Sequence, residues 1–358
     1  MTIKTLVGLS GGVDSAVAAL LLKQQGYEVI GAIMTIWDDS LPLPKAGGGA
    51  CLGPEEDDIE TAAAVAAALK IPFHVVDCRA QYAETVLENF RSEYARGRTP
   101  NPCVRCNSRI KFGVLPAGAR AAGVEFDKFA TGHYARIERA PQGYFRLATA
   151  RDPARDQTYF IHRLDPEQLS GVLFPLGGYL KTEVRALARQ HALPVHDKPD
   201  SQDFYCGDYN DILRFPNRPG EIVDKAGKTL GTHTGIWNYT IGKRRGLGIS
   251  GEKTPLYVTA LDGATNRVTV GPKSELYAAA LVAEDVLWQS GAAPAQPVKV
   301  MVKIRQAHPP AEATAFALNG NCARVEFAKP QLSVTPGQSA VFYQYGAVIG
   351  GGVIRQAL

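Results

Sequence analysis

Residues Gly8 to Ser15 read GLSGGVDS, a turn rich in glycine and hydroxyl groups between an apolar run and a segment with helical spacing. Glycines let several backbone N–H groups converge on one point, the serines add hydroxyl groups, and the start of the next helix carries partial positive charge. A loop of this composition is suited to hold pyrophosphate. Asp14, at the helix start, interacts favourably with the helix dipole and could also hold Mg²⁺.

Other interpretations of this loop are weaker. Gly8 to Gly12 matches the G-x-S-x-G nucleophile elbow of α/β-hydrolases, in which Ser10 would attack an acyl group. That elbow also needs an amide from an earlier strand–helix loop, whereas only one strand fits before Gly8. A Walker A loop requires a lysine, and none follows Gly12. A plain turn without a ligand does not need such a cluster of glycines and polar residues.

Cys103 and Cys106, in the stretch NPCVRCNSR, are also spaced for chemistry. Prolines stiffen the chain before them, and we expect Arg105 and Arg109 to lower the pKa values of their thiols. The pair suits half of a zinc site, a redox pair or part of a three-ligand cluster, and no second C-x₂-C completes a zinc ribbon. Cys206 is the remote candidate for a third member. The other cysteines are expected to be small buried or incidental residues, namely Cys51, Cys78 and Cys322.

The elements that must position these residues alternate along the first part of the chain. Strand-like runs such as TLVGLS, EVIGAIMTI and PFHVVDC are separated by helical stretches such as DSAVAALLLKQQG and DIETAAAVAAALK. This alternation predicts an α/β fold over residues 1–200, in which helices cover both faces of a parallel sheet.

The sequence changes in character after this α/β part. Short Gly- and Thr-rich segments come first, and strands with alternating inward and outward residues follow between Pro and Gly turns. We therefore predict a small central domain over residues 201–267 and a C-terminal β-barrel over residues 268–358.

Composition places the chain among globular proteins. It has 358 residues, 45% of them hydrophobic, and a formal charge of +4 that alone does not argue for nucleic acid. We expect a soluble, cytoplasmic protein without membrane contact, because the sequence shows neither a leader pattern nor an apolar run of ~18 residues. Six cysteines are too few for a disulfide framework in a chain of this length.

The stretch SGGVDS resembles the PP-loop of the ATP pyrophosphatase superfamily, whose members cleave ATP between the α- and β-phosphates and adenylate a carbonyl oxygen. Further stretches resemble the tRNA-specific 2-thiouridylases, which thiolate the wobble uridine: TPNPCVRCNSRIKFG, ATGHYAR, RDQTYF, KPDSQDFYCGD, GIWNYTIGKRRGLGI and TPGQSAVFY with GGGVI. The resemblance covers nearly the whole chain. It implies a Rossmann-like fold of the adenine nucleotide alpha hydrolase type, ATP accompanied by Mg²⁺, and tRNA as partner.

The resemblance also implies which residues border the nucleotide. They are the eight residues of the loop, one methionine at the end of the second strand and one glycine in the stretch TGHYA: Gly8, Leu9, Ser10, Gly11, Gly12, Val13, Asp14, Ser15, Met34 and Gly132. Core packing is an equally good reading of Met34, since a lone methionine in a strand often fills a core.

Sulfur delivery needs thiolates or a cluster beside the adenylated base, and the resemblance points to Cys103, Cys106 and Cys206. The family usually has an acidic residue where Cys103 stands, and its second-loop cysteine stands at the position of Tyr205. These departures weaken a two-cysteine scheme in which Cys206 carries a persulfide and Cys106 expels its sulfur by forming a disulfide. Three cysteines would instead bind a [4Fe-4S] cluster whose fourth iron presents hydrosulfide. We place the cluster narrowly ahead because Cys103 adds a soft ligand.

Wobble uridine lies in a single-stranded loop, where its edge can be read after modest unstacking. By resemblance, the residues that contact tRNA are His133, Arg155, Asp156, Gln157, Arg305, Gln306 and Gln338. Gln306 replaces an expected aromatic residue, so stacking on a base would have to come from elsewhere. Basic clusters after Lys243, around Arg96 and around Arg151 would meet phosphates, although each alone is more often a solvated face.

The sequence thus predicts a tRNA-uridine 2-sulfurtransferase, in which ATP activates the C2 oxygen, sulfur attacks C2 and AMP leaves. The sulfur donor stays open among a persulfide carrier protein, a cysteine desulfurase and sulfide. A PP-loop amide-forming ligase would use the same loop, but with an amine source and no cysteine trio. A non-catalytic tRNA-binding protein would not need a pyrophosphate-binding loop.

Overall fold

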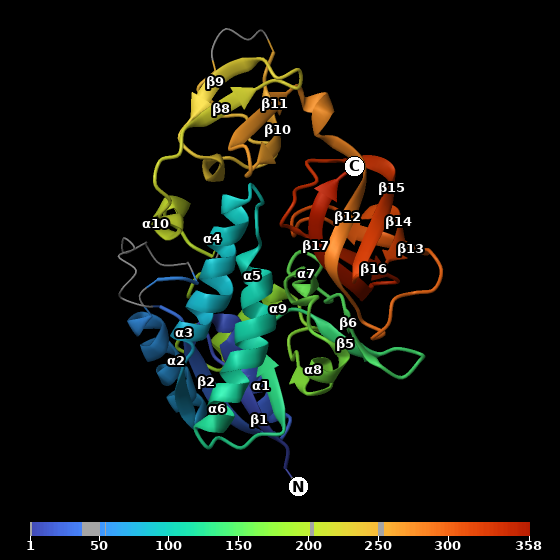
Figure 1. The fold of residues 1–358 in the computed structure, drawn as a ribbon. Coiled ribbons are helices and arrows are strands. Elements are labelled where there is room, and N and C mark those ends of the chain that lie inside the picture. Colours follow the sequence, from blue (N-terminus) through green and yellow to red (C-terminus); the bar gives the residue numbers. More distant parts are fainter. Residues whose placement is uncertain (1, 38–50, 54, 201–203, 250–253) are drawn as a thin grey trace.

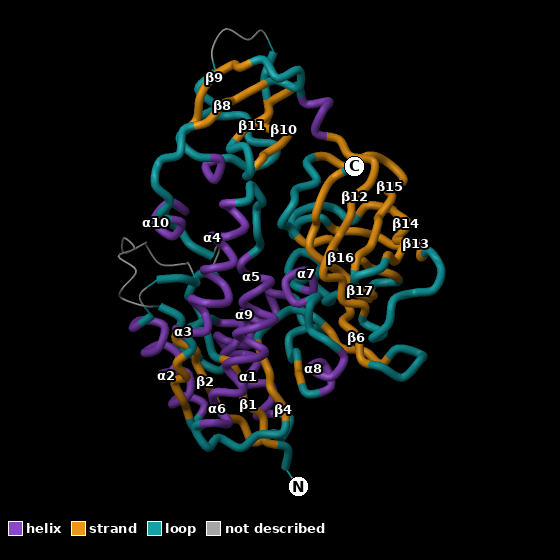
Figure 2. Tube along the Cα trace, in the orientation of Figure 1, coloured by secondary structure: helices purple, strands orange, loops and turns teal. Residues whose placement is uncertain are grey.

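The computed structural model describes residues 2–37, 51–53, 55–200, 204–249 and 254–358. Figure 1 shows an N-terminal α/β part, a small sheet domain at the top and a barrel beside them. Most helices lie in the N-terminal part, and strands dominate the other two (Figure 2). No helix among the described residues is long and apolar enough to cross a membrane.

The N-terminal sheet has five parallel strands in the order β3–β2–β1–β4–β7. Their bounds are Lys4–Gly8 for β1, Glu28–Thr35 for β2, Phe73–Asp77 for β3, Lys128–Thr131 for β4 and Val172–Leu173 for β7. The strand order reverses between β1 and β4, and ligands of open α/β sheets bind outside the carboxyl ends of strands at such a point. The Gly8–Ser15 loop begins at the end of β1, and Gly132 directly follows β4, so both lie at this point of the sheet.

Helices cover both faces of this sheet, as predicted. Alternate residues of β1 face opposite sides, so that Leu6 and Val7 belong to two different core clusters. Val7 faces α1, α2 and α9, whose bounds are Val13–Gln24, Glu56–Leu69 and Lys181–Gln190. Leu6 faces α3 (Arg79–Tyr82), the π-helix η1 (Ala83–Leu87), α4 (Glu88–Ala95), α5 (Pro102–Arg105), the π-helix η2 (Cys106–Val114) and α6 (Leu115–Ala121).

The central domain follows the short helix α10 (Tyr209–Leu213). Its four strands run in the order β10–β11–β8–β9 around a small apolar core that includes Ile222 and Val268. Their bounds are Gly220–Val223 for β8, Thr229–His233 for β9, Tyr257–Asp262 for β10 and Arg267–Gly271 for β11, with the 3₁₀ turn η3 at Ile236–Asn238.

The 3₁₀ turn η4 (Lys273–Leu276) leads into the C-terminal barrel. The barrel strands are β12 Tyr277–Trp288, β13 Val298–Lys303, β14 Ala311–Leu318, β15 Cys322–Leu332, β16 Ser339–Gln344 and β17 Ala347–Ala357. It closes because β12 pairs with both β15 and β17. The predicted fold class, an α/β parallel-sheet domain followed by a small domain and a barrel, is therefore confirmed.

Two strands of the N-terminal part extend the barrel sheet, which the sequence pattern did not predict. The hairpin of β5 (Arg136–Arg139) and β6 (Phe145–Ala148) joins β17 through the pair Ala148 and Ala347. The helices α7 (Thr158–Ile161) and α8 (Pro166–Ser170) follow this hairpin.

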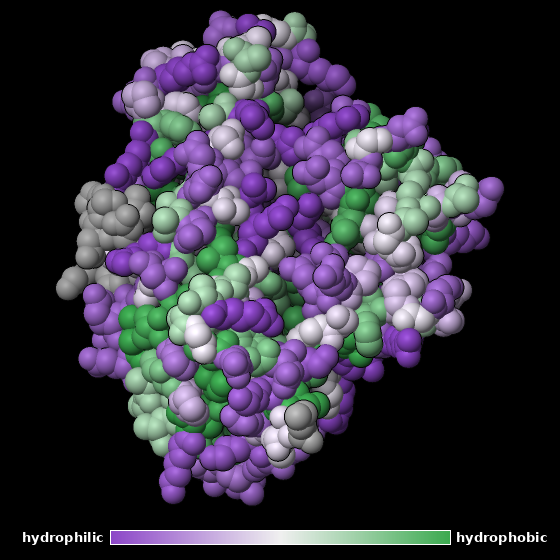
Figure 3. Space-filling view, turned by 60° about the horizontal axis from the view of Figure 1, so that its bottom comes forward, coloured by the Kyte–Doolittle hydropathy of each residue, from purple (hydrophilic) through white to green (hydrophobic). Residues whose placement is uncertain are grey.

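Side-chain hydrogen bonds further tie the barrel to the N-terminal part. Tyr159 donates its hydroxyl to Ser339 O at 3.1 Å, and the buried Gln289 donates to His162 O and Leu164 O. On the face drawn in Figure 3, hydrophobic residues are most continuous over the lower part of the molecule, and hydrophilic residues predominate above.

Candidate active site

The glycine loop at the end of β1 is tightly folded against α2. Gly11 has a φ of 67°, and a methyl group there would lie 2.9 Å from the backbone oxygen of Asp58. Gly12 caps α1 without a side-chain hydrogen bond, so no side chain of the cap covers the first amides of this helix. These features suit a backbone surface that receives an anion.

The two serines of the loop have different positions. Ser15 is buried, accepts a hydrogen bond from Ser10 N at 3.1 Å and donates its own hydroxyl to Gly12 O at 3.1 Å. Ser10 is exposed, and its hydroxyl lies 3.3 Å from that of Ser15. Ser15 therefore braces the loop, whereas Ser10 offers a hydroxyl at the surface.

The other positions implied for the nucleotide lie on neighbouring strands. A methyl group on Gly132, just after β4, would stand 2.6 Å from the backbone of both Asp14 and Ser15. Only glycine leaves β4 this close to the start of α1. Met34 lies near the end of β2 and packs partly buried against the core on the α3–α6 side.

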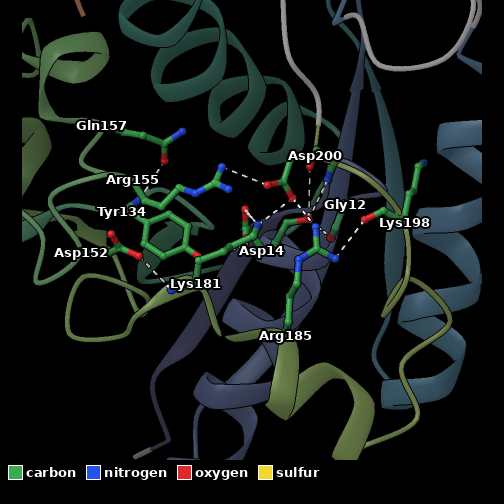
Figure 4. Close-up of polar contacts among 12 residues, drawn as sticks. Gly12, Asp14, Tyr134, Asp152, Arg155, Gln157, Lys181, Arg185, Lys198 and Asp200 are labelled. Atoms are coloured by element: carbon green, nitrogen blue, oxygen red, sulfur yellow. Dashed lines mark hydrogen bonds and ion pairs between the residues drawn. The ribbon is translucent and has the colours of Figure 1, made fainter. Parts of the chain in front are cut away.

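Asp14 is held by two residues from elsewhere in the chain (Figure 4). Lys181 Nζ lies 2.8 and 2.7 Å from its two carboxylate oxygens, and the Tyr134 hydroxyl donates to Oδ1 at 2.9 Å. Burial and the Asp14 carboxylate raise the pKa of Tyr134, so its hydroxyl stays a donor. Asp152 accepts a hydrogen bond from Lys181 N at 3.0 Å, which fixes the start of α9.

Asp200 collects three positive charges at the same place. Lys181 Nζ and Arg185 each lie 2.8 Å from Asp200 Oδ1, and Arg155 lies 3.0 Å from Oδ2. Burial opposes ionisation, but the hydrogen bond and charge of Lys181, with both arginines, hold the pKa of Asp200 below its usual value. Sequence reasoning found Arg155 but missed the lysine, Arg185 and Asp200, since Lys181 lies 167 residues from Asp14.

Lys198 adds a further link between this segment and the glycine loop. Its Nζ lies 2.7 Å from Asp58 Oδ1, and Asp58 is the residue against which Gly11 packs. The segment after α9 therefore supports the glycine loop indirectly, through Asp58 of α2.

Cys103 and Cys106 lie on consecutive turns of one helical segment. Asn101 caps α5 by accepting a hydrogen bond from Val104 N at 3.2 Å, with Pro102 at the first helical position. Cys106 begins the π-helix η2, and single π-turns are frequent at functional sites. Both cysteines are partly exposed.

The electrostatic expectation was wrong for Cys106. Burial raises the pKa of Cys106 to about 11, and the positive charge that partly offsets burial belongs to Lys111. Arg105, expected to act with Arg109, instead donates to Thr85 O at 2.7 Å. Desolvation outweighs the cationic neighbourhood that the sequence suggested.

Cys206 follows two aromatic residues that point inward. Phe204 and Tyr205 are both buried, and Tyr205 donates its hydroxyl to Asp211 Oδ2 at 2.8 Å. Cys206 is exposed. Tyr205, which occupies the family's cysteine position, is therefore part of the core, and the thiol has moved to the surface. The backbone of Phe204 accepts a hydrogen bond from Leu52 N at 3.0 Å, which brings the loop with Cys51 beside this segment.

The cysteine arrangement does not fit the expected [4Fe-4S] cluster. In the described parts of the chain, which include Cys103, Cys106 and Cys206, no three His, Cys, Asp or Glu residues are grouped so that they could hold a metal ion. Magnesium is a different case, because one carboxylate such as that of Asp14 suffices for it together with substrate phosphates.

The remaining cysteines differ among themselves. Cys78 is fully buried, as expected, and burial raises its pKa to about 12. Cys51 is exposed rather than buried, and its thiolate would raise the pKa of Cys106, which places the two near each other. Cys322 lies at the start of β15 in the barrel and donates to Gly320 O.

His133 is placed inside the protein, which is at odds with a direct contact to tRNA. It is 8% exposed, lies between Phe112 and Phe174, and its Nδ1 is 2.7 Å from Thr131 Oγ1. Burial, followed by the charge of Lys111, holds its pKa well below the usual value, so the imidazole is neutral. We assign it to packing behind β4.

Most of the other residues implied for tRNA bind protein groups. Asp156 is buried and accepts hydrogen bonds from Ala150 N and the Thr158 hydroxyl, and Gln157 accepts one from Tyr134 N at 2.9 Å. The barrel residues donate to backbone carbonyls: Arg305 to Leu332 O, Gln306 to Asp156 O and Gln338 to Thr99 O and Pro100 O. Gln338 thereby supports the chain just before Cys103.

Three protein-family models match consecutive parts of the chain. Residues 3–206 match the tRNA methyl transferase HUP domain, residues 213–272 the tRNA methyl transferase PRC-barrel domain, and residues 278–354 the aminomethyltransferase beta-barrel domain.

Two relatives of nearly the same length as this chain carry the same name. The tRNA-specific 2-thiouridylase MnmA of Endomicrobium trichonymphae is 55% identical over 354 residues, covering 98% of each chain. That of Geobacter metallireducens is 47% identical, covering 99% of this chain and 97% of its own.

Among solved structures, a 4-thiouridine synthetase in complex with RNA and ATP matches 59% of this chain and 49% of its own, with 16% identity and a TM-score of 0.32.

Proposed function

The chain belongs to the tRNA-specific 2-thiouridylase family, and we propose that it catalyses ATP-dependent 2-thiolation of the wobble uridine of tRNA. The observation that carries the proposal is the glycine loop at the switch point between β1 and β4, in a chain matched over its full length by thiouridylases. The proposed setting is the cytoplasm, with Mg²⁺ accompanying ATP.

The first step uses the glycine loop. The amides at the start of α1 and the exposed Ser10 hydroxyl bind the β- and γ-phosphates of ATP, which leave as pyrophosphate. The uridine C2 oxygen attacks the α-phosphorus, the bond to the β-phosphate oxygen breaks, and the base becomes adenylated at that oxygen. Preorganised donors favour this step because they already point at the place where negative charge grows. Asp14 would hold Mg²⁺ against the phosphates.

The second step uses the two thiols. The terminal sulfur of a persulfide on Cys206 attacks C2, and AMP leaves with the former uridine oxygen. The Cys106 thiolate then attacks Cys206 Sγ, so that the sulfur–sulfur bond breaks, 2-thiouridine is released and a Cys106–Cys206 disulfide remains. An external dithiol reduces this disulfide. The exposed position of Cys206 suits loading by a persulfide carrier protein or a cysteine desulfurase, which transfer sulfur that is already oxidised. Sulfide would load Cys206 only by attacking its Sγ in the Cys106–Cys206 disulfide, which breaks that bond, releases the Cys106 thiolate and leaves the persulfide.

For tRNA, we propose that Arg155 is the charged contact of its group, because its side chain is 47% exposed. The other residues act indirectly, by holding protein groups in place. Gln157 holds Tyr134, and Gln338 holds the chain before Cys103. Asp156 and Gln306 are linked to each other, and Arg305 bonds the barrel backbone.

The test is to incubate the protein with unmodified tRNA, Mg²⁺·ATP and a persulfide donor, and to analyse the nucleosides by mass spectrometry. The proposal expects 2-thiouridine only when ATP is present, with one pyrophosphate for each thiolated base. An amide-forming ligase would instead consume ATP with an amine and leave the tRNA without sulfur, which would overturn the proposal.

A further inference from the structure

Three cations surround one carboxylate beside the glycine loop. Lys181, Arg185 and Arg155 all lie within 3.0 Å of an Asp200 oxygen, and Lys181 also bonds Asp14 (Figure 4). The group therefore carries three positive charges against two negative ones. The Lys181 side chain is 10% exposed and that of Asp200 is 21% exposed, so these charges are only partly screened by water.

This group of cations supplies the positive charge that the glycine loop itself lacks. The loop contains no lysine, so its backbone amides alone would face a strongly charged pyrophosphate. Lys181 Nζ bonds Asp14 from the first turn of α1, which places the lysine directly at the loop. Arginine and lysine are the usual partners of phosphate oxygens, and arginine can bind them with two hydrogen bonds.

Asp200 pairs with these cations in the way that a phosphate group would. Its two oxygens accept hydrogen bonds or ion pairs from all three side chains, in the way that two oxygens of one phosphate group would. Lys198, next but one before Asp200, is held separately by Asp58, so the segment keeps an anchor if Asp200 leaves the cations.

We propose that Lys181 and Arg185 bind the phosphates of ATP, and that Asp200 is an internal anion that fills their site until ATP displaces it, which leaves Arg155 to tRNA. The inference rests on the proposed use of ATP and names the cations that this use requires. It makes Asp200 a competitor of the nucleotide. A metal ligand or a purely structural partner at this position would help ATP binding or leave it unchanged.

The sign of one mutational effect separates these roles. Asp200→Asn frees the cations, and we expect Mg²⁺·ATP and inorganic pyrophosphate each to bind about tenfold more tightly, as measured by calorimetric titration. Lys181→Met should weaken both by at least about tenfold. Asp197→Asn and Arg189→Met are matched controls, since these exposed residues pair with each other on the same segment and helix, and neither should change binding.

Unchanged or weaker binding of ATP and pyrophosphate to Asp200→Asn would overturn the inference, provided that its thermal unfolding matches the parent protein. Asp200→Ser serves as a second variant, and it should bind ATP more tightly for the same reason. If the parent protein itself bound no ATP, the proposed function would fail instead. If it bound ATP and thiolated tRNA while both Asp200 variants bound ATP less tightly, only the competitor role of Asp200 would fail.

Discussion

The ionisation of Cys106 gives a prediction with a worked magnitude. Burial raises the pKa of this thiol to about 11, so about one thiol in ten thousand is ionised at pH 7 and about one in a hundred at pH 9. Because only the thiolate is a nucleophile, alkylation of Cys106 by iodoacetamide should accelerate about tenfold for each pH unit over this range. Removing the offsetting charge with Lys111→Met should slow the reaction at every pH in the range.

The assay is alkylation of the intact protein at pH 7, 8 and 9, followed by mass spectrometry of the peptide that carries Cys106. An Arg120→Met variant is a suitable control for charge removal, because Arg120 stacks on Phe126 at the end of α6. A rate that levels off between pH 8 and 9 would refute the reasoning, since it would indicate a thiol that ionises without a burial penalty.

Three further results are expected. Gly132→Ala should abolish ATP binding and destabilise the fold by ~1–3 kcal/mol, because the added methyl group meets backbone that cannot move away. Gly178→Ala, which has open space around it, should do neither. Nucleotide titration measures ATP binding, and thermal unfolding measures stability. Cys206→Ala should stop sulfur transfer to tRNA yet keep tRNA-dependent pyrophosphate release, and an active variant would exclude the persulfide step. Cys103→Ala should slow thiolation without ending it, and the parent protein purified under anaerobic conditions should contain no iron. A complete loss of activity in the variant, together with bound iron in the parent protein, would instead support the cluster hypothesis.

The glycine loop was predictable because all its information is local. Glycines and hydroxyl groups between a strand and a helix identify an anion site from a few consecutive residues, and the structure adds that Ser15 braces the loop while Ser10 faces outward. The alternating pattern likewise predicted the parallel sheet and the barrel, since each depends on periodicity within single elements.

The charged part of the site was not predictable in the same way. Lys181 reaches Asp14 only through the packing of α9 beside α1, and Asp200 joins the site by pairing with Lys181. Nothing near either residue in the sequence signals these contacts. The exposure of Cys206 depends on Tyr205 entering the core, and the neutral state of His133 on the aromatic rings around it. Such properties follow from tertiary burial, which a sequence pattern does not specify.

The central claim is that ATP adenylates the C2 oxygen of uridine before sulfur arrives. An isotope experiment tests it most directly: tRNA carrying ¹⁸O at C2 of the wobble uridine is thiolated by the protein, and the AMP released is weighed by mass spectrometry. The account predicts that the label moves from the base to AMP, one atom for each 2-thiouridine formed. Thiolated tRNA accompanied by unlabelled AMP would contradict it.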